Sequence, residues 1–229
     1  MYLATCTRPD ISFAVSMLSQ FSSKPNTKHQ NALERLLAYL NYSKNKSLII
    51  KPSNEISISA YSDADWASDV NDRKSFSGYT VKINDSTVNW SSSKQKTVAT
   101  STTEAEYIAL ASTAKDVLWW LSFMKAINKK VINKTTIFCD NNSAIAIGEG
   151  KGKFSKSKHF DIKLHFIKDL TEKSIIKLKY IKTKSQIADI LTKSLPRPAH
   201  ELLTKSLMLF TPDTQNGGDV KDSVCQSST

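Results

Sequence analysis

The sequence predicts an α/β protein in which a five-stranded mixed sheet is flanked by helices and preceded by a short helical extension. Three features support this fold class. An alternating apolar and polar stretch leads into a hairpin pattern, a long helical pattern follows, and two later strand patterns are each followed by helical residues. This order is typical of a sheet that starts as an antiparallel meander and continues through crossover connections.

The first fifty residues show two helical patterns. Asp10 can cap a segment whose apolar side chains recur at helical spacing as far as Phe21. The stretch SSKPN at 22–26 interrupts this pattern, and a second apolar stripe runs from Ala32 to Leu40. We expect both stripes to be packing faces of helices rather than parts of a catalytic site.

The predicted sheet begins directly after this segment. Residues 56–61 alternate between apolar and polar side chains, which predicts a strand with two different faces. Asp63 has the parity of the polar residues, so we expect it on the polar face near the C-terminal end of the strand. The stretches SGYTVKI (77–83) and STVNWSS (86–92) then predict a hairpin that continues an antiparallel sheet.

The second half of the chain alternates between helical and strand patterns. A long helix is predicted from about Thr103 to Ile127, and the four tryptophans of the chain are expected in the core. The nearly all-apolar stretch TTIFCD at 135–140 predicts a short strand in the centre of the sheet. The remaining elements are expected as a short helix from about Asn141, a basic helix at about 161–171, a strand at 175–181 and helices at about 186–195 and 199–208.

The formal charge of +11 is unevenly distributed along the chain. Residues 55–72 contain five acids and no Lys or Arg, whereas residues 151–195 contain twelve lysines and four acids. An acidic pocket beside a basic surface suits a metal-dependent enzyme that acts on phosphates, although composition alone also fits ordinary solvated faces. The three cysteines show no metal-binding spacing, which is typical of a reducing compartment, and no apolar run is long enough to cross a bilayer.

Acidic residues occur where the elements of such a sheet could bring them together. Asp63 and Asp140 each lie at the end of a predicted strand, and Asp189 opens a late helix. Glu104 and Glu106 both lie at the start of the long helix. Carboxylates at these positions can converge at one edge of an open sheet, where hard oxygen donors suit Mg²⁺. The four acids other than Asp63 also have a purely structural explanation, because each occupies a position where carboxylates cap helices or favour the helix dipole.

Four motifs occur in order over residues 55–200. They read YSDADWASD…RKSFSGYTV…WSSSKQKTVATSTTEAEYIALA (61–111), CDNNSAI (139–145), KSKHFDIKLHFIKD (156–169) and YIKTKSQIADILTKSL (180–195). Together they closely resemble the RNase H domain of copia-type retrotransposon Pol polyproteins. Upstream, YLATCTRPDISFAVSMLSQF (2–21) and HQNALERLLAYL (29–40) resemble the end of the reverse transcriptase of the same family.

This resemblance to the C-terminal part of a Pol polyprotein implies three regions. Residues 1–50 would be the helical end of the reverse transcriptase, and residues 55–209 would form the RNase H-like domain. The tail at 210–229 lacks apolar periodicity and is expected to be disordered. The sequence lacks the paired aspartates of a polymerase palm, so no polymerase activity is expected of it.

The resemblance also implies an active site of four carboxylates that are both catalytic and metal-binding: Asp63, Glu106, Asp140 and Asp189. Two Mg²⁺ ions are implied as cofactors, with Mn²⁺ as a substitute. Glu104 is a second candidate for the glutamate, but at about 100° per residue it points roughly 200° away from Glu106, so only one of the two can face the metals. The stretch EYIAL from Glu106 fits the family pattern better, which would leave Glu104 as a cap or a solvent contact.

The activity implied by the resemblance is hydrolysis of the RNA strand of RNA–DNA hybrids during retrotransposon reverse transcription, with 5′-phosphate and 3′-hydroxyl products. Lysines of the basic segment are expected to bind the hybrid backbone in a salt-sensitive way, namely Lys156, Lys158, Lys163, Lys182 and Lys184. Other implied partners are the reverse transcriptase and integrase of Pol, and no membrane is expected. The implied location is the cytoplasm or a virus-like particle, with the nucleus as an alternative.

The sequence departs from cellular RNases H in one respect. Those enzymes carry a histidine-bearing loop before the last aspartate, whereas KTKSQIAD here has none. His159 and His165 lie upstream, where they are expected as surface or packing residues.

Two other functions are alternatives to RNase H activity. An integrase-type nuclease would need its glutamate last in chain order, and here it is second. The remaining alternative is a non-catalytic, nucleic-acid-binding remnant of a decayed retrotransposon Pol, which an assay for metal-dependent cleavage would distinguish.

Overall fold

The computed structural model describes residues 1–152, 158–207 and 209–210 of the chain. Helices labelled η are 3-10 helices. The first part of the chain contains α1 (Tyr2–Cys6), η1 (Pro9–Ile11), α2 (Ser12–Ser19), α3 (Thr27–Tyr42), β1 (Ser47–Leu48), β2 (Ile58–Asp65), β3 (Phe76–Ile83) and β4 (Ser86–Lys94). The second part contains α4 (Thr102–Ala126), β5 (Thr135–Cys139), α5 (Asn142–Gly148), α6 (Lys158–Glu172), β6 (Ile176–Tyr180), η2 (Thr183–Ser185), η3 (Ile187–Leu191), α7 (Arg197–Ser206) and β7 (Leu209–Phe210).

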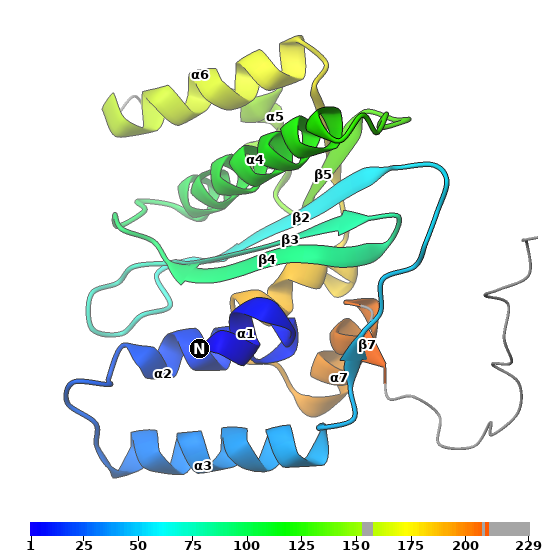
Figure 1. Cartoon of the computed structure of the whole chain (residues 1–229). Helices are drawn as coiled ribbons and strands as arrows, with labels where there is room; N and C mark the ends of the chain where they lie inside the picture. The colour runs from blue at the N-terminus through cyan, green and yellow to red at the C-terminus, as the bar shows by residue number, and fades with distance from the viewer. Residues whose placement is uncertain (153–157, 208, 211–229) are drawn as a thin grey trace, which may run out of the picture.

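Five of the strands form one mixed sheet in the order β4-β3-β2-β5-β6 (Figure 1). β2, β3 and β4 pair as an antiparallel meander, whereas β5 pairs in parallel with both β2 and β6. This topology confirms the predicted RNase H-like fold class. Because β2 and β5 are parallel neighbours, their C-terminal ends meet at the same edge of the sheet.

Helices cover both faces of this sheet. Figure 1 shows α4, α5 and α6 on one face and α1, α2 and α7 on the other. The main core lies between α4 and the sheet, where Leu110 and Val117 of the helix and Ile137 of β5 are fully buried. Burial of all four tryptophans was the wrong expectation, since Trp66 is 43% and Trp119 57% exposed.

The end of the sheet domain differs from the prediction in its local geometry. The helix expected at 186–195 is instead the five-residue 3-10 helix η3. The side chain of Gln186 accepts a hydrogen bond from the Ala188 backbone at 3.3 Å, and the Thr192 hydroxyl donates to the Asp63 carboxylate. These tertiary and capping contacts fix a tight turn at this position instead of a continuous α-helix.

The last described residues form a small second ladder. β1 and β7 pair in antiparallel fashion, with Ser47 opposite Phe210. The predicted tail thus begins at a paired residue, and its positions 211–229 lie outside the described residues. Within the described part of the chain, no helix combines the length and the apolar character needed to cross a bilayer.

A buried polar network holds the N-terminal segment together. Asp10 does not cap a helix as predicted, because its carboxylate accepts hydrogen bonds from Arg8 Nε at 2.9 Å, Arg8 Nη2 at 2.7 Å and the Tyr39 hydroxyl at 2.6 Å. Arg8 Nη2 also donates to Ser43 Oγ at 2.6 Å. The Asp10 carbonyl lies 3.1 Å from His200 Nε2, so the network connects the first helices to α7.

The second predicted packing stripe is only partly packed. None of the sixteen residues of α3, all of which the structure describes, is buried. Leu33 and Leu37 are 48% and 55% exposed. They line an apolar groove of about 1100 Å³ between α3 and the helices α1 and α2.

Replacing Asp10 with Asn should destabilise the protein, because the buried Arg8 guanidinium would lose its charged partner. We expect the free energy of unfolding to fall by about 3 kcal/mol in urea denaturation at neutral pH. The matched control is Glu34→Gln on the exposed part of α3, where a change within about 0.5 kcal/mol is expected. Equal effects of the two substitutions would contradict a structural role for the network.

Candidate active site

Asp63 is delivered to the edge of the sheet by β2. The side chain follows the predicted parity and is 2% exposed, deep beneath η3. The hydroxyl of Thr192 donates a hydrogen bond to Asp63 Oδ2. The position therefore combines a buried carboxylate with a neutral hydrogen-bond donor that fixes its direction.

Asp140 follows the last residue of β5, and its carboxylate is not used as a helix cap. The side chain of Asn141 caps α5 instead, by accepting a hydrogen bond from the Ala144 backbone at 3.0 Å. Asp140 Oδ2 accepts a hydrogen bond from Thr183 Oγ1 at 2.9 Å. Because β5 runs parallel to β2, Asp140 emerges at the same edge as Asp63.

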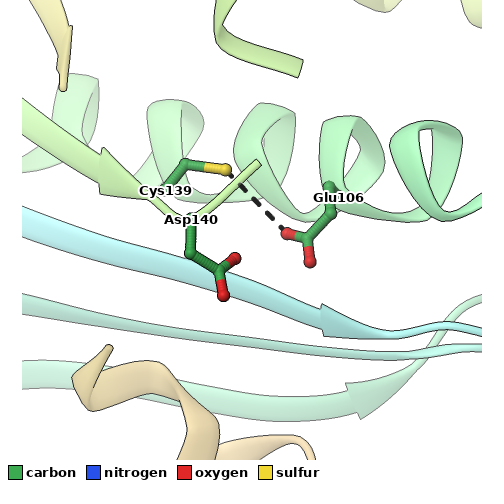
Figure 2. Close-up of side chains that lie close together, drawn as sticks. All are labelled: Glu106, Cys139 and Asp140. Carbon is green, nitrogen blue, oxygen red and sulfur yellow. Dashed lines mark hydrogen bonds between the residues drawn. The ribbon is translucent and has the colours of Figure 1, made fainter. Parts of the chain in front are cut away.

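The first turns of α4 separate the two glutamates. Ser101 caps the helix, and Glu104 Oε2 accepts hydrogen bonds from the Thr100 backbone at 2.7 Å and the Thr100 hydroxyl at 2.6 Å. Glu106 points into the protein, is 7% exposed, and its Oε2 accepts a long hydrogen bond from the Cys139 thiol at 4.0 Å. Figure 2 shows Glu106 directed toward Cys139 and Asp140 at the end of β5. Glu104 therefore has a local structural role, whereas Glu106 faces the sheet edge.

Asp189 is placed by the attachment of η3 to the sheet. The fully buried Gln186 donates from Nε2 to the Ser62 carbonyl at 2.9 Å and accepts from the Ala188 backbone at 3.3 Å. Gln186 thus connects Ser62, which precedes Asp63, with Ala188, which precedes Asp189. Figure 1 shows the segment that carries Asp189 on the face of the sheet opposite α4.

Glycine at position 78 allows this close attachment. Gly78 lies opposite Asp63 in the β2–β3 pairing. A Cβ atom at this position would lie 2.7 Å from both Leu191 Cβ and Thr192 Cγ2. Such separations are shorter than van der Waals contact, so a larger residue would move η3, and with it Asp189, away from the sheet.

The four acids form one cluster, with Asp140 at its centre. Ligand atoms of Asp63, Asp140 and Asp189 lie within 4.8 Å of one another, and so do those of Glu106, Cys139 and Asp140. Asp189 Oδ1 is buried and has no hydrogen-bond partner among the described residues. Carboxylate oxygens with unused acceptor capacity are the ligands that Mg²⁺ and Mn²⁺ prefer, so the donor set fits a divalent cation of this class.

Burial and mutual repulsion make this cluster hard to ionise completely. Burial, together with the charges of Asp63 and Asp140, raises the pKa of Glu106 to about 9. Burial and the Asp63 charge raise the pKa of Asp189 to about 7, and burial also raises the pKa of Asp63. A cation bound among these groups would relieve the repulsion and release their protons.

A lysine already contributes one positive charge to the cluster. Lys193 Nζ lies 3.1 Å from Asp189 Oδ1 and 3.7 Å from Asp63 Oδ2. Although burial alone would lower the pKa of Lys193, the charges of these two aspartates raise it. The side chain therefore remains an ammonium in the pH range where the acids titrate.

The predicted substrate-binding lysines lie in two places. Lys182 and Lys184 are exposed on either side of Thr183, which contacts Asp140, so both are at the rim of the cluster. Lys163 lies on α6, which covers the same face of the sheet as α4 (Figure 1). Lys156 lies outside the described residues, as does the side chain of Lys158. Binding of substrate by these lysines stays a prediction.

Several residues of the site were not identified from the sequence. The acids are held by Thr183, Gln186, Thr192 and Lys193, through contacts that span 43 to 130 residues. The one local signal is the spacing of Lys193, which follows Asp189 by four residues. A basic residue at this spacing pairs readily with an acid on the same helical turn.

The chain is similar in sequence to known proteins over most of its length. No protein-family model matches the chain. The retrovirus-related Pol polyprotein from transposon RE1 of Arabidopsis thaliana is 40% identical over 200 residues, which cover 87% of this chain and 14% of that protein. The Pol polyprotein from transposon TNT 1-94 of Nicotiana tabacum is 36% identical over 202 residues, or 88% of this chain and 15% of that protein. The chain thus spans about one seventh of the length of these relatives.

A shorter relative and two solved structures are also similar. The secreted RxLR effector protein 161 of Plasmopara viticola is 46% identical over 119 residues, which cover 52% of this chain and 84% of that protein. The N-terminal RNase H domain of rv2228c from Mycobacterium tuberculosis is 14% identical, with a TM-score of 0.45, and covers 66% of this chain and 99% of that one. LC11-RNase H1 in complex with RNA/DNA hybrid is 18% identical, also with a TM-score of 0.45, over 59% of this chain and 94% of that one.

The raised pKa values predict how stability depends on pH in the metal-free protein. Above about pH 4.5 the unfolded chain releases protons that Glu106 and Asp189 retain in the native state, so the free energy of unfolding should fall as pH rises toward about 9. Glu106→Gln removes the largest of these contributions. We expect the variant to be more stable than wild type by roughly 1 kcal/mol or more above about pH 7.

Urea denaturation in EDTA between about pH 5 and pH 9 measures this difference. The matched control is Glu104→Gln, whose carboxylate lies outside the cluster and should leave the slope of stability against pH unchanged. Superimposable pH profiles for wild type and Glu106→Gln would contradict the placement of Glu106 in a buried, repulsive cluster.

Proposed function

The chain belongs to the family of copia-type, retrovirus-related Pol polyproteins, and we propose that it is the ribonuclease H part of such a protein. In this proposal it hydrolyses the RNA strand of RNA–DNA hybrids and leaves 5′-phosphate and 3′-hydroxyl ends. The observation that carries the proposal is the convergence of four carboxylates, three of them buried and Asp140 half-buried, at the edge where β2 and β5 end in parallel.

The four acids would hold divalent cations, for which two Mg²⁺ ions are the proposed set and Mn²⁺ a substitute. Asp63, Asp140 and Asp189 offer one group of oxygens, and Glu106 extends it on the side of α4. When bound in such a site, divalent cations stabilise the charge that develops on a phosphate and lower the pKa of bound water. The Cys139 thiol lies beside Glu106, but burial raises its pKa, so the ionised donors are carboxylate oxygens. Such oxygens suit Mg²⁺ and Mn²⁺ better than softer metals.

The other residues of the site would hold the four carboxylates in fixed positions and orientations. Thr183 and Thr192 each donate to one carboxylate, and Gln186 fixes η3 to β2. These neutral donors direct the carboxylate oxygens without adding negative charge. Their contribution would be preorganisation, so that little rearrangement is needed when cations and substrate bind.

The proposed substrate is a hybrid duplex bound through its backbone. The formal charge of +11 favours a polyanion, and the exposed Lys182 and Lys184 lie at the rim of the acidic cluster. Binding of this kind is salt-sensitive and largely independent of sequence, and 2′-hydroxyl groups would distinguish the RNA strand. The proposed context is a complex with the reverse transcriptase and integrase parts of Pol, in the cytoplasm or a virus-like particle, with the nucleus as an alternative. The division into residues 1–50 and 55–209 is part of this proposal.

Cleavage of a hybrid with a labelled RNA strand in the presence of Mg²⁺ tests the function. Wild type should cut the RNA strand, and EDTA should abolish the activity. Asp140→Asn should lower the rate at least ~100-fold, because loss of a ligand matters at least as much as loss of the groups that orient ligands. Glu104→Gln is the matched control and should cut at close to the wild-type rate.

Other results would point elsewhere. Binding of the hybrid without cleavage would favour the non-catalytic remnant. Cleavage that persists in Asp140→Asn, or in EDTA, would show that the acidic cluster is not the active site.

A further inference from the structure

Lys193 occupies an unusual position for a basic residue in this protein. It follows η3 and lies four residues after Asp189. Its Nζ is 3.1 Å from Asp189 Oδ1 and 3.7 Å from Asp63 Oδ2. Its side chain is 31% exposed, so it reaches the acids and also borders solvent.

The ammonium competes for the oxygens that a metal would use. The ligand atoms of Asp63, Asp140 and Asp189 lie within 4.8 Å of one another, and Lys193 Nζ is close to two of these three carboxylates. A divalent cation bound by the same oxygens would stand within a few ångströms of the ammonium. Two positive charges at that separation repel strongly in a partly buried site, so a bound metal ion and Lys193 in this position exclude one another.

The backbone of Lys193 is fixed, whereas its side chain can be released. The Lys193 backbone N–H donates to the Asp189 carbonyl at 3.2 Å, and Thr192 is anchored to Asp63. The Lys193 side chain is 31% exposed, and its ion pair with Asp189 Oδ1 at 3.1 Å is made by the Nζ atom at its end. The ammonium can therefore leave for solvent without disturbing η3.

We propose that Lys193 is a built-in counter-ion that holds Asp63 and Asp189 together in the metal-free protein and is displaced when a divalent cation binds. It is a positioning residue that acts on the acids and sets the metal concentration at which the site fills. This inference rests on the proposed function, because it takes the acidic cluster to be a metal site. It adds that metal affinity is weakened by a residue of the chain itself.

Titration with Mn²⁺ followed by calorimetry at fixed pH tests the proposal without any cleavage assay. Lys193→Met keeps the length of the side chain and removes its charge, so it should bind Mn²⁺ about 10-fold more tightly than wild type. Lys193→Arg keeps the charge and should bind close to wild type. Lys177→Met, at an exposed position on β6 away from the acids, is the matched control and should leave the affinity unchanged.

A second measurement covers the case in which Lys193→Met does not fold without metal. In wild-type protein, the side-chain ammonium signal of Lys193, assigned by its absence from Lys193→Arg, should be visible by NMR without metal. It should shift or broaden by exchange with water as Mg²⁺ saturates the site. An unchanged signal at saturation would overturn the proposal.

The outcomes separate this inference from the proposed function. Equal or weaker Mn²⁺ binding by Lys193→Met would overturn the counter-ion role even if wild type cleaves hybrids. Tighter binding in a protein that cuts no hybrid would support the counter-ion role and contradict the nuclease. Loss of Mn²⁺ binding in Lys193→Met would mean that Lys193 builds the site rather than competing for it.

Discussion

The electrostatic cost of placing four carboxylates at one buried sheet edge is the constraint on which the site depends. Parallel pairing of β2 and β5 brings Asp63 and Asp140 to the same edge, and α4 and η3 add Glu106 and Asp189 from opposite faces of the sheet. Left alone, these groups would repel one another and favour their protonated forms. The fold offsets the repulsion with neutral donors and one ammonium. A divalent cation would neutralise the negative charge that remains, and the proposed chemistry needs such a cation at this edge.

Segments that are distant in sequence pack around the sheet edge that carries the four acids and help to position it. Leu191 of η3 packs with Leu203 and Leu207 in a small apolar cluster beneath the sheet, so α7 helps to position Asp189. The N-terminal helices contact the same region, since Trp90 Nε1 donates to the Ala4 carbonyl at 2.7 Å and the Arg8–Asp10 network reaches α7 through His200. The first fifty residues are therefore packed against the sheet domain, while an open apolar groove remains between α3 and the helices α1 and α2.

Local patterns predicted the elements of the fold and the acids they carry. Asp63 and Asp140 could be placed because each lies at the end of a strand pattern. Helical geometry indicated that only one of Glu104 and Glu106 could face the sheet edge, and the resemblance to the family pattern favoured Glu106. Where long-range contacts decide the geometry, the local pattern was insufficient. Asp10 was taken for a cap because nothing nearby in sequence indicates its contact with Tyr39, and η3 was expected as a longer helix because the contacts of Gln186 and Thr192 with β2 are more than 120 residues apart. The residues that stabilise the acids carry almost no local signal for the same reason.

The most direct test of the acidic cluster as a metal site is anomalous diffraction from crystals soaked in Mn²⁺. The strongest anomalous peaks should lie among the carboxylates of Asp63, Asp140 and Asp189, with the Lys193 ammonium displaced from its place beside Asp189. Strong peaks at other acids, such as Asp69 and Asp72 in the β2–β3 loop, with none at the sheet edge, would contradict the central claim. In that case the cluster of four carboxylates would need an explanation other than metal binding.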